Sequence, residues 1–174
     1  MEQSKTSLMK QAMTFGAIIG LALVVYSVFL YITGFTFNNA LAFVQYVVLF
    51  AGIYLGTKDY RDKALAGFIT YGKALGLGVL ISVFVGIITL FFNFIMMRFI
   101  DPDLIDKSLA IAEERMENNR FISADQLDDA LERSRWLLTS VWSLPIGLIS
   151  FSFIGFIISL ITSAFVKRDP NPVA

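Results

Sequence analysis

Four long apolar segments, none of which contains a charged side chain, dominate this chain of 174 residues. They cover residues 13–33, 40–57, 74–97 and 136–166. A helix needs about 20 predominantly apolar residues to cross a hydrocarbon core about 30 Å thick, so three segments are long enough and the second lies near the lower limit. Only helices and closed barrels satisfy the backbone in lipid, and runs this long do not alternate as barrel strands do. The pattern predicts an all-α membrane protein with a bundle of four transmembrane helices, forming a single membrane domain.

The composition narrows the chemistry that such a bundle can perform. The chain contains no cysteine and no histidine, so disulfides, thiolate metal sites, cysteine nucleophiles and the commonest general base are all missing. The apolar segments also lack the ionisable residues that ion-coupled transporters and proton relays place inside the membrane. The formal net charge is zero, and nothing in it suggests nucleic acid as a partner. We therefore expect no catalytic residues, no metal, no cofactor and no enzymatic activity.

Each of the four segments carries small residues four positions apart. This spacing lets helix backbones approach closely in lipid, where no hydrophobic force drives helices together. Because the spacing recurs in every segment, it predicts tight packing inside the bundle, and a homodimer through one of these faces is an alternative. The residues are Gly16 and Gly20; Gly52 and Gly56; Gly78, Ser82 and Gly86; and Gly155, Ser159 and Ser163.

A polar stretch at about residues 101–135 separates the third and fourth segments and has the pattern of two amphipathic helices. Asp101 followed by Pro102 is typical of a helix start, and Ser123 with Gln126 forms a capping box. Apolar residues then share one face of each helix, and carboxylates share the other. The pattern predicts an antiparallel hairpin over residues 102–118 and 123–135 that extends spans three and four. The expected contacts join Leu104, Ile105, Leu109 and Met116 to Leu127 and Leu131.

The sequence also predicts how the hairpin joins the fourth span and where its first helix lies. The second helix is predicted to continue unbroken into the fourth span, whose full segment would be about 46 Å long if straight. Pro145 lies inside that segment and removes a ladder hydrogen bond, which predicts a kink. As an alternative for the first helix, an amphipathic segment can lie flat on the membrane surface, although an acidic face disfavours contact with anionic lipid.

Positive side chains near the spans predict the orientation, because lysine and arginine accumulate in cytoplasmic flanks. If both termini are cytoplasmic, that side holds eight basic residues, whereas the short turn at residues 34–39 on the other side holds none. The first segment is longer than the usual signal-peptide core, and a second apolar segment follows at once, so we expect it to be retained. The eight residues are Lys5, Lys10, Lys58, Arg61, Lys63, Lys73, Lys167 and Arg168.

The basic loop predicted between the second and third spans, residues 58–73, is the candidate binding region. It brings basic and aromatic side chains to the depth of the lipid headgroups, where they can bind a lipid phosphate or a protein partner. Orientation of the protein by positive charge alone is the simpler alternative. The candidate residues are Lys58, Tyr60, Arg61, Lys63, Tyr71 and Lys73.

The same loop carries a family resemblance. Residues 52–63 end a helix with Tyr60 and Arg61, and residues 67–78 open the next span with Gly67, aromatic residues, Gly72 and Lys73. This pattern resembles an uncharacterised bacterial membrane family, the domain of unknown function DUF 4199, found mainly in Bacteroidota. The resemblance implies a multi-pass protein of the bacterial inner membrane. It implies no activity and no catalytic residues.

These observations favour one function class and leave two alternatives. The lack of catalytic groups, beside a basic loop and an acidic hairpin, favours a non-enzymatic scaffold or accessory subunit with the bilayer and a membrane protein as partners. The first alternative is a small channel or transporter for a neutral or lipid-like substrate, which would depend on Gln45, Asn93 and hydroxyl groups. The second is an enzyme that acts on lipid-linked substrates at the headgroup layer.

Overall fold

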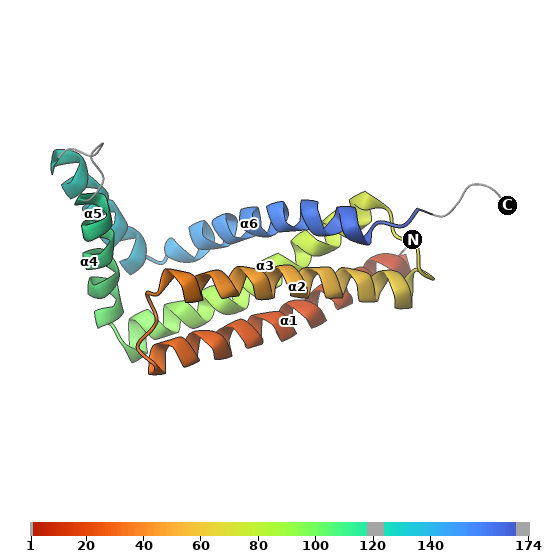
Figure 1. Ribbon diagram of the computed structural model, residues 1–174, viewed down its shortest axis with the longest axis horizontal. Coiled ribbons are helices and arrows are strands. Elements are labelled where there is room, and N and C mark those ends of the chain that lie inside the picture. Colours follow the sequence, from red (N-terminus) through yellow and green to blue (C-terminus); the bar gives the residue numbers. More distant parts are fainter. Residues whose placement is uncertain (1, 118–123, 170–174) are drawn as a thin grey trace. The chain divides into compact units, whose positions relative to one another are not determined.

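The computed structural model describes residues 2–117 and 124–169 (Figure 1). In chain order, the helices are α1 (Glu2–Ile32), α2 (Asn39–Ala64), α3 (Tyr71–Ile95), the π-helix η1 (Met96–Ile100), α4 (Asp103–Glu117), α5 (Ala124–Thr139) and α6 (Ser143–Val166). Four stretches of helix are long and apolar enough to cross a membrane: Leu8–Ile32, Asn39–Ala64, Tyr71–Ile100 and Ser143–Val166. The predicted all-α membrane fold with four spans is confirmed.

The described residues form two compact units. We call the first the bundle unit, and it contains the chain up to Thr89 together with the residues from Leu148 onward. The second, which we call the hairpin unit, contains Leu90–Gly147. The four spans thus contribute most of their length to the bundle unit, while the polar stretch belongs to the hairpin unit.

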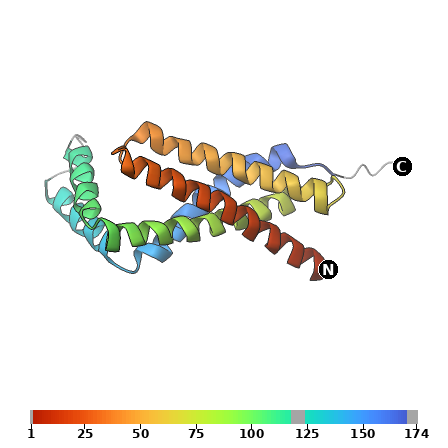
Figure 2. The ribbon, with the colours of Figure 1, turned by 90° about the horizontal axis from the view of Figure 1, so that it is seen from below.

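In the bundle unit, α1 and α2 run side by side in opposite directions and are joined by a short turn (Figures 1 and 2). Gly34 has a φ of +77°, which a residue without Cβ adopts without strain. Asn38 then caps α2, because its side-chain oxygen accepts hydrogen bonds from the amides of Ala40 and Leu41. The core of the unit is apolar and includes Ala12, Ile19, Leu23, Leu49, Ile53, Ala74, Leu77, Ile81, Val85 and Val166.

Small residues let the helices of the bundle unit approach one another closely. Gly16 faces Phe84 of α3, and Gly52 faces Ile19 of α1. On the seam between α3 and α6, a Cβ atom at Gly78 would lie only 2.5 Å from Ser159 Oγ, and one at Gly155 would overlap the side chain of Ser82. The small-residue faces are therefore in use between helices of one chain, as predicted for tight packing inside the bundle.

The hairpin unit contains the two polar helices that the sequence predicts. α4 and α5 pack against each other, and Asp106 near the start of α4 pairs with Arg135 near the end of α5 at 2.7 Å, so the helices are antiparallel. Leu104 and Leu109 are buried, and Ile105, Met116, Leu127 and Leu131 are half-buried. The predicted turn of the hairpin and Ser123 of the capping box lie outside the described residues, as does the side chain of Gln126.

The connection from the hairpin to the fourth span differs from the prediction. α5 ends at Thr139 and α6 begins at Ser143, so the second helix does not run unbroken into a span that starts at Trp136. Between them, Ser140 Oγ accepts a hydrogen bond from the amide of Trp142 at 3.2 Å and offers the backbone an alternative to helix. Pro145 sits in the first turn of α6, where an N–H has no helical partner in any case. The predicted kink was therefore wrong, because Pro145 helps to start the helix and α6 is only about 36 Å long.

The third span also ends in a way that the sequence did not predict. α3 does not stop near Met97 but passes into η1, a π-helical turn that ends at Ile100. The amide of Asp101 then donates to the carbonyl of Met96 at 2.8 Å. Asp101 also pairs with Lys107 of α4 at 3.5 Å, which ties the end of this span to the hairpin that follows.

Candidate functional site

The predicted basic loop is mostly helix. α2 continues to Ala64 and carries Lys58, Arg61 and Lys63 in its last turns, where positive charge favours the C-terminal end of a helix. The chain reverses at Ala66 and Gly67, whose φ values are +51° and +87°. The amide of Gly67 donates to the carbonyl of Arg61 at 2.9 Å and closes the turn before α3 begins. The connecting segment is thus residues 65–70 rather than 58–73.

Arg61 is a structural residue of this corner. Its Nη1 donates to the carbonyl of Val166 at 3.0 Å, and its Nε and Nη2 donate to the carboxylate of Asp62 at 2.7 and 3.2 Å. Val166 is the last residue of α6, so its carbonyl belongs to the group that a helix leaves without an internal partner. With a side chain only 14% exposed, Arg61 satisfies that carbonyl and joins the ends of α2 and α6.

Two more of the predicted residues also serve the fold. The side chain of Tyr60 is only 2% exposed and belongs to the core of the bundle unit. Lys63 pairs with Asp59 at 2.5 Å, and Asp59 accepts a second hydrogen bond from Gln11 Nε2 at 2.9 Å. The same nitrogen of Gln11 lies 3.3 Å from the carbonyl of Gly56, so this cluster links α1 to α2.

The segment after α6 is paired with the segment before α3. The amide of Ile69 donates to the carbonyl of Arg168 at 2.9 Å, and the amide of Arg168 donates to the carbonyl of Ile69 at 3.0 Å. Nearby, the hydroxyl of Tyr71 donates to the carbonyl of Leu160 at 3.2 Å. These bonds place Arg168, which was not among the candidate residues, beside the predicted region.

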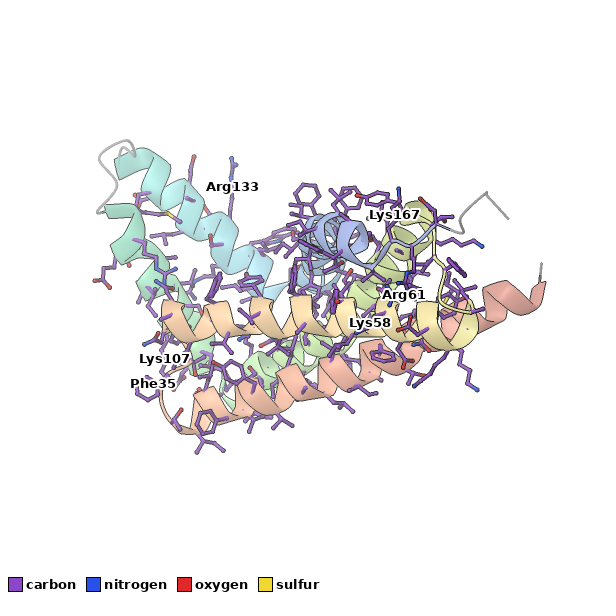
Figure 3. All side chains as sticks on the ribbon, turned by 45° about the vertical axis from the view of Figure 1, so that its right-hand side comes forward. Phe35, Lys58, Arg61, Lys107, Arg133 and Lys167 are labelled. Carbon is purple, nitrogen blue, oxygen red and sulfur yellow. The ribbon has the colours of Figure 1, made fainter. Side chains whose placement is uncertain are left out.

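Lys58 and Lys73 are two candidate residues whose side chains the fold does not use in a contact between helices. Both side chains are exposed, and neither forms an ion pair within the part of the chain that the structure describes. Figure 3 shows Lys58, Arg61 and Lys167 at one end of the bundle unit and Phe35 at the other. We call the end that carries Lys58 and Lys73 the basic end. Over the described residues, it offers cations and tyrosines but no group of three side chains that is suited to hold a metal ion.

The structure brings together residues that sequence spacing does not connect. Gln11 and Asp59 are 48 positions apart, and Arg61 and Val166 are 105 apart. The eight basic residues assigned to one side by the positive-inside rule were the only signal that pointed to Lys10, Lys167 and Arg168. That rule gives the side of the membrane, but it does not give the contacts within the corner.

Comparisons with known proteins place the chain in a family without adding a function. No curated protein and no solved structure matches it. One family matches residues 14–168. The match begins within α1 and ends at Arg168, in the segment that pairs with Ile69 after α6. The match includes the whole corner built by Arg61, Ile69 and Arg168. The chain therefore belongs to the family described as "Protein of unknown function (DUF4199)".

Proposed function

We propose that this protein is a non-enzymatic scaffold or accessory subunit of the bacterial inner membrane. The proposal rests on a difference among the candidate residues at the basic end: some contact other parts of the bundle, and others are exposed. Arg61 bonds the end of α6 and Tyr60 is buried in the core, whereas Lys58 and Lys73 are exposed. Lys63 is also exposed, and it pairs with Asp59 within α2. A packed bundle that displays charge at its surface is suited to bind a partner.

The interior of the bundle unit supports a scaffold over a channel or transporter. Its buried side chains are mainly aliphatic, and four of the five buried serine and threonine hydroxyls among the described residues bond a carbonyl of their own helix. Thr57 donates to the carbonyl of Ile53 at 2.8 Å, and Ser159 donates to that of Gly155 at 2.6 Å. Ser163 is the exception, because its hydroxyl is buried without a hydrogen-bond partner. Transport of a polar solute is the less favoured function.

Two surfaces are available to a partner. Along α6, large apolar side chains such as Phe153 and Phe165 are exposed and face either acyl chains or a second membrane protein. In the hairpin unit, the outer face of α5 carries exposed acidic side chains, including Asp128, Asp129 and Glu132. The lipid-facing surface supports association within the membrane, and the acidic face supports association with a basic partner outside it.

The orientation belongs to the same proposal. The described basic side chains of the bundle unit gather at one end, and the turn between α1 and α2 at the other end has none. By the positive-inside rule, the basic end is cytoplasmic, as are both termini. The family resemblance, with its Bacteroidota members, supports the bacterial inner membrane as the location.

The scaffold proposal predicts a stable partner in native membranes. We expect the tagged full-length protein, extracted in mild detergent and analysed by mass spectrometry, to recover one membrane protein in near-stoichiometric amount. Reversing charge on α5 by Asp128→Lys and Asp129→Lys should weaken this recovery if the partner binds the acidic face. Recovery of the protein alone, at the mass of a monomer, under several mild extraction conditions would contradict the scaffold role.

A further inference from the structure

Charge at the basic end is not balanced. Among the described side chains of the bundle unit, each of the three carboxylates is in an ion pair: Asp59 with Lys63, Asp62 with Arg61, and Asp169 with Lys167. Four cations of the same unit are left outside any ion pair in the described residues, and we call them the unpaired cations: Lys10, Lys58, Lys73 and Arg168.

Three of the unpaired cations lie on elements that meet at one corner: Lys58 on α2, Lys73 in the first turn of α3, and Arg168 in the segment after α6. Lys58 lies one turn before Asp62 in α2, and both Lys58 and Arg168 act electrostatically on the Asp62 carboxylate. That carboxylate already accepts two hydrogen bonds from Arg61. Arg168 is fixed through its backbone to Ile69, which lies four residues before Lys73. The single charge of Asp62 is therefore paired with Arg61 at close range and does not balance the other cations, whose positive charge is available to an external anion.

The depth of this corner identifies the kind of anion. The charge-free part of α2 ends at Thr57, and Lys58 follows it directly, so the corner begins where the hydrocarbon core ends. Lysine and arginine at this depth lay their aliphatic stems along the apolar surface and carry their charge to the headgroups. Phe68, which is 45% exposed in the turn between α2 and α3, adds an apolar side chain to the same corner. The anion within reach is the phosphate of a phospholipid.

We propose that Lys58, Lys73 and Arg168 bind the headgroup of an acidic phospholipid at the basic end of the bundle unit. The cations contact the phosphate, and the excess positive charge selects lipids with a net negative headgroup over zwitterionic ones. The inference rests on the proposed function only in requiring that the bundle cross the membrane. It requires no protein partner, so it can fail while co-purification succeeds, and the reverse also holds.

The test is native mass spectrometry of the full-length protein in detergent, titrated with phosphatidylglycerol or with phosphatidylcholine of the same chain length. We expect tighter binding of phosphatidylglycerol. The double variant Lys58→Gln and Lys73→Gln should weaken it about 30-fold, because each basic residue near a membrane surface contributes about a five-fold effect. Arg168→Gln should add a similar loss, and Lys58→Arg with Lys73→Arg should restore binding.

The matched control is the double variant Lys63→Gln and Lys167→Gln, which removes the same charge at the same end from cations that are already paired. It should retain most of the phosphatidylglycerol binding. Three results would overturn the proposal: equal binding of the two lipids, an equal loss in the control variant, or complete displacement of the lipid by millimolar inorganic phosphate, which would make free phosphate the ligand. Circular dichroism on each variant verifies that the helices are intact.

Discussion

Replacing Gly155 with alanine is expected to lower the unfolding free energy by about 1–3 kcal/mol, the usual cost of forcing an extra methyl group into a packed core. The added Cβ would overlap both Cβ and Oγ of Ser82 on α3. Neither atom can swing away, because Ser82 is fully buried and its hydroxyl donates to the carbonyl of Val79. The seam between α3 and α6 must widen, which separates the neighbouring contact of Gly78 with Ser159 as well.

The measurement is thermal unfolding in detergent, where we expect a drop of about 5 °C for a chain of this size. Gly76→Ala is the matched control, since it adds the same methyl group on α3 at a position with nothing within 4 Å. The control should be neutral or stabilising by up to about 1 kcal/mol through helix propensity. Equal melting temperatures for the two variants would show that the seam is not closely packed.

The second large effect is expected at Arg61. Arg61→Gln removes a charged donor from the carbonyl of Val166, at a typical cost of about 1.5–3 kcal/mol. The pair with Asp62 adds little to this, because the Asp62 side chain is 44% exposed and its charge is screened by water. The lost hydrogen bond destabilises the end of α6 and the adjacent backbone pair of Ile69 and Arg168. The two hydrogen bonds of that pair should therefore open more often.

Hydrogen exchange followed by mass spectrometry measures this opening. We expect the amides of Ile69 and Arg168 to exchange at least about ten-fold faster in Arg61→Gln, the equivalent of 1.4 kcal/mol. Asp62→Asn is the control, because it weakens the ion pair and keeps Arg61 opposite Val166. If both variants exchanged at the rate of the unmodified protein, Arg61 would not hold the end of α6.

Much of the fold follows from patterns within single segments. The charge-free runs predict the four spans, since crossing a bilayer imposes a length and a polarity that local sequence reveals directly. The apolar and acidic faces on opposite sides of residues 102–118 likewise predict α4, whose Leu104 and Leu109 are buried. The break at Ser140 was missed because an apolar run continues through it. Its cause is a single hydroxyl bonded two residues ahead, together with a proline placed for a helix start.

The candidate site was harder to predict, because its roles depend on distant neighbours. Arg61 resembles Lys58 and Lys73 in sequence, yet it bonds the end of α6, and Tyr60 beside it packs into the core. Lys63 differs, because its partner Asp59 lies four residues before it in the same helix. A basic residue that satisfies a helix end cannot be told from an open one until the helices are packed. Arg61, which is among the residues that carry the family resemblance, has contacts here that serve the structure.

Membrane topology with single cysteines tests the account most directly, because the chain has no cysteine of its own. Four crossings with a cytoplasmic basic end place Phe35 and Asp128 on the outer side and Lys63 on the inner side. In intact cells, we expect a membrane-impermeant thiol reagent to label Phe35→Cys and Asp128→Cys but to label Lys63→Cys only after the cells are opened. Labelling of Lys63→Cys in intact cells, or opposite results for Phe35→Cys and Asp128→Cys, would contradict the predicted orientation or the four crossings.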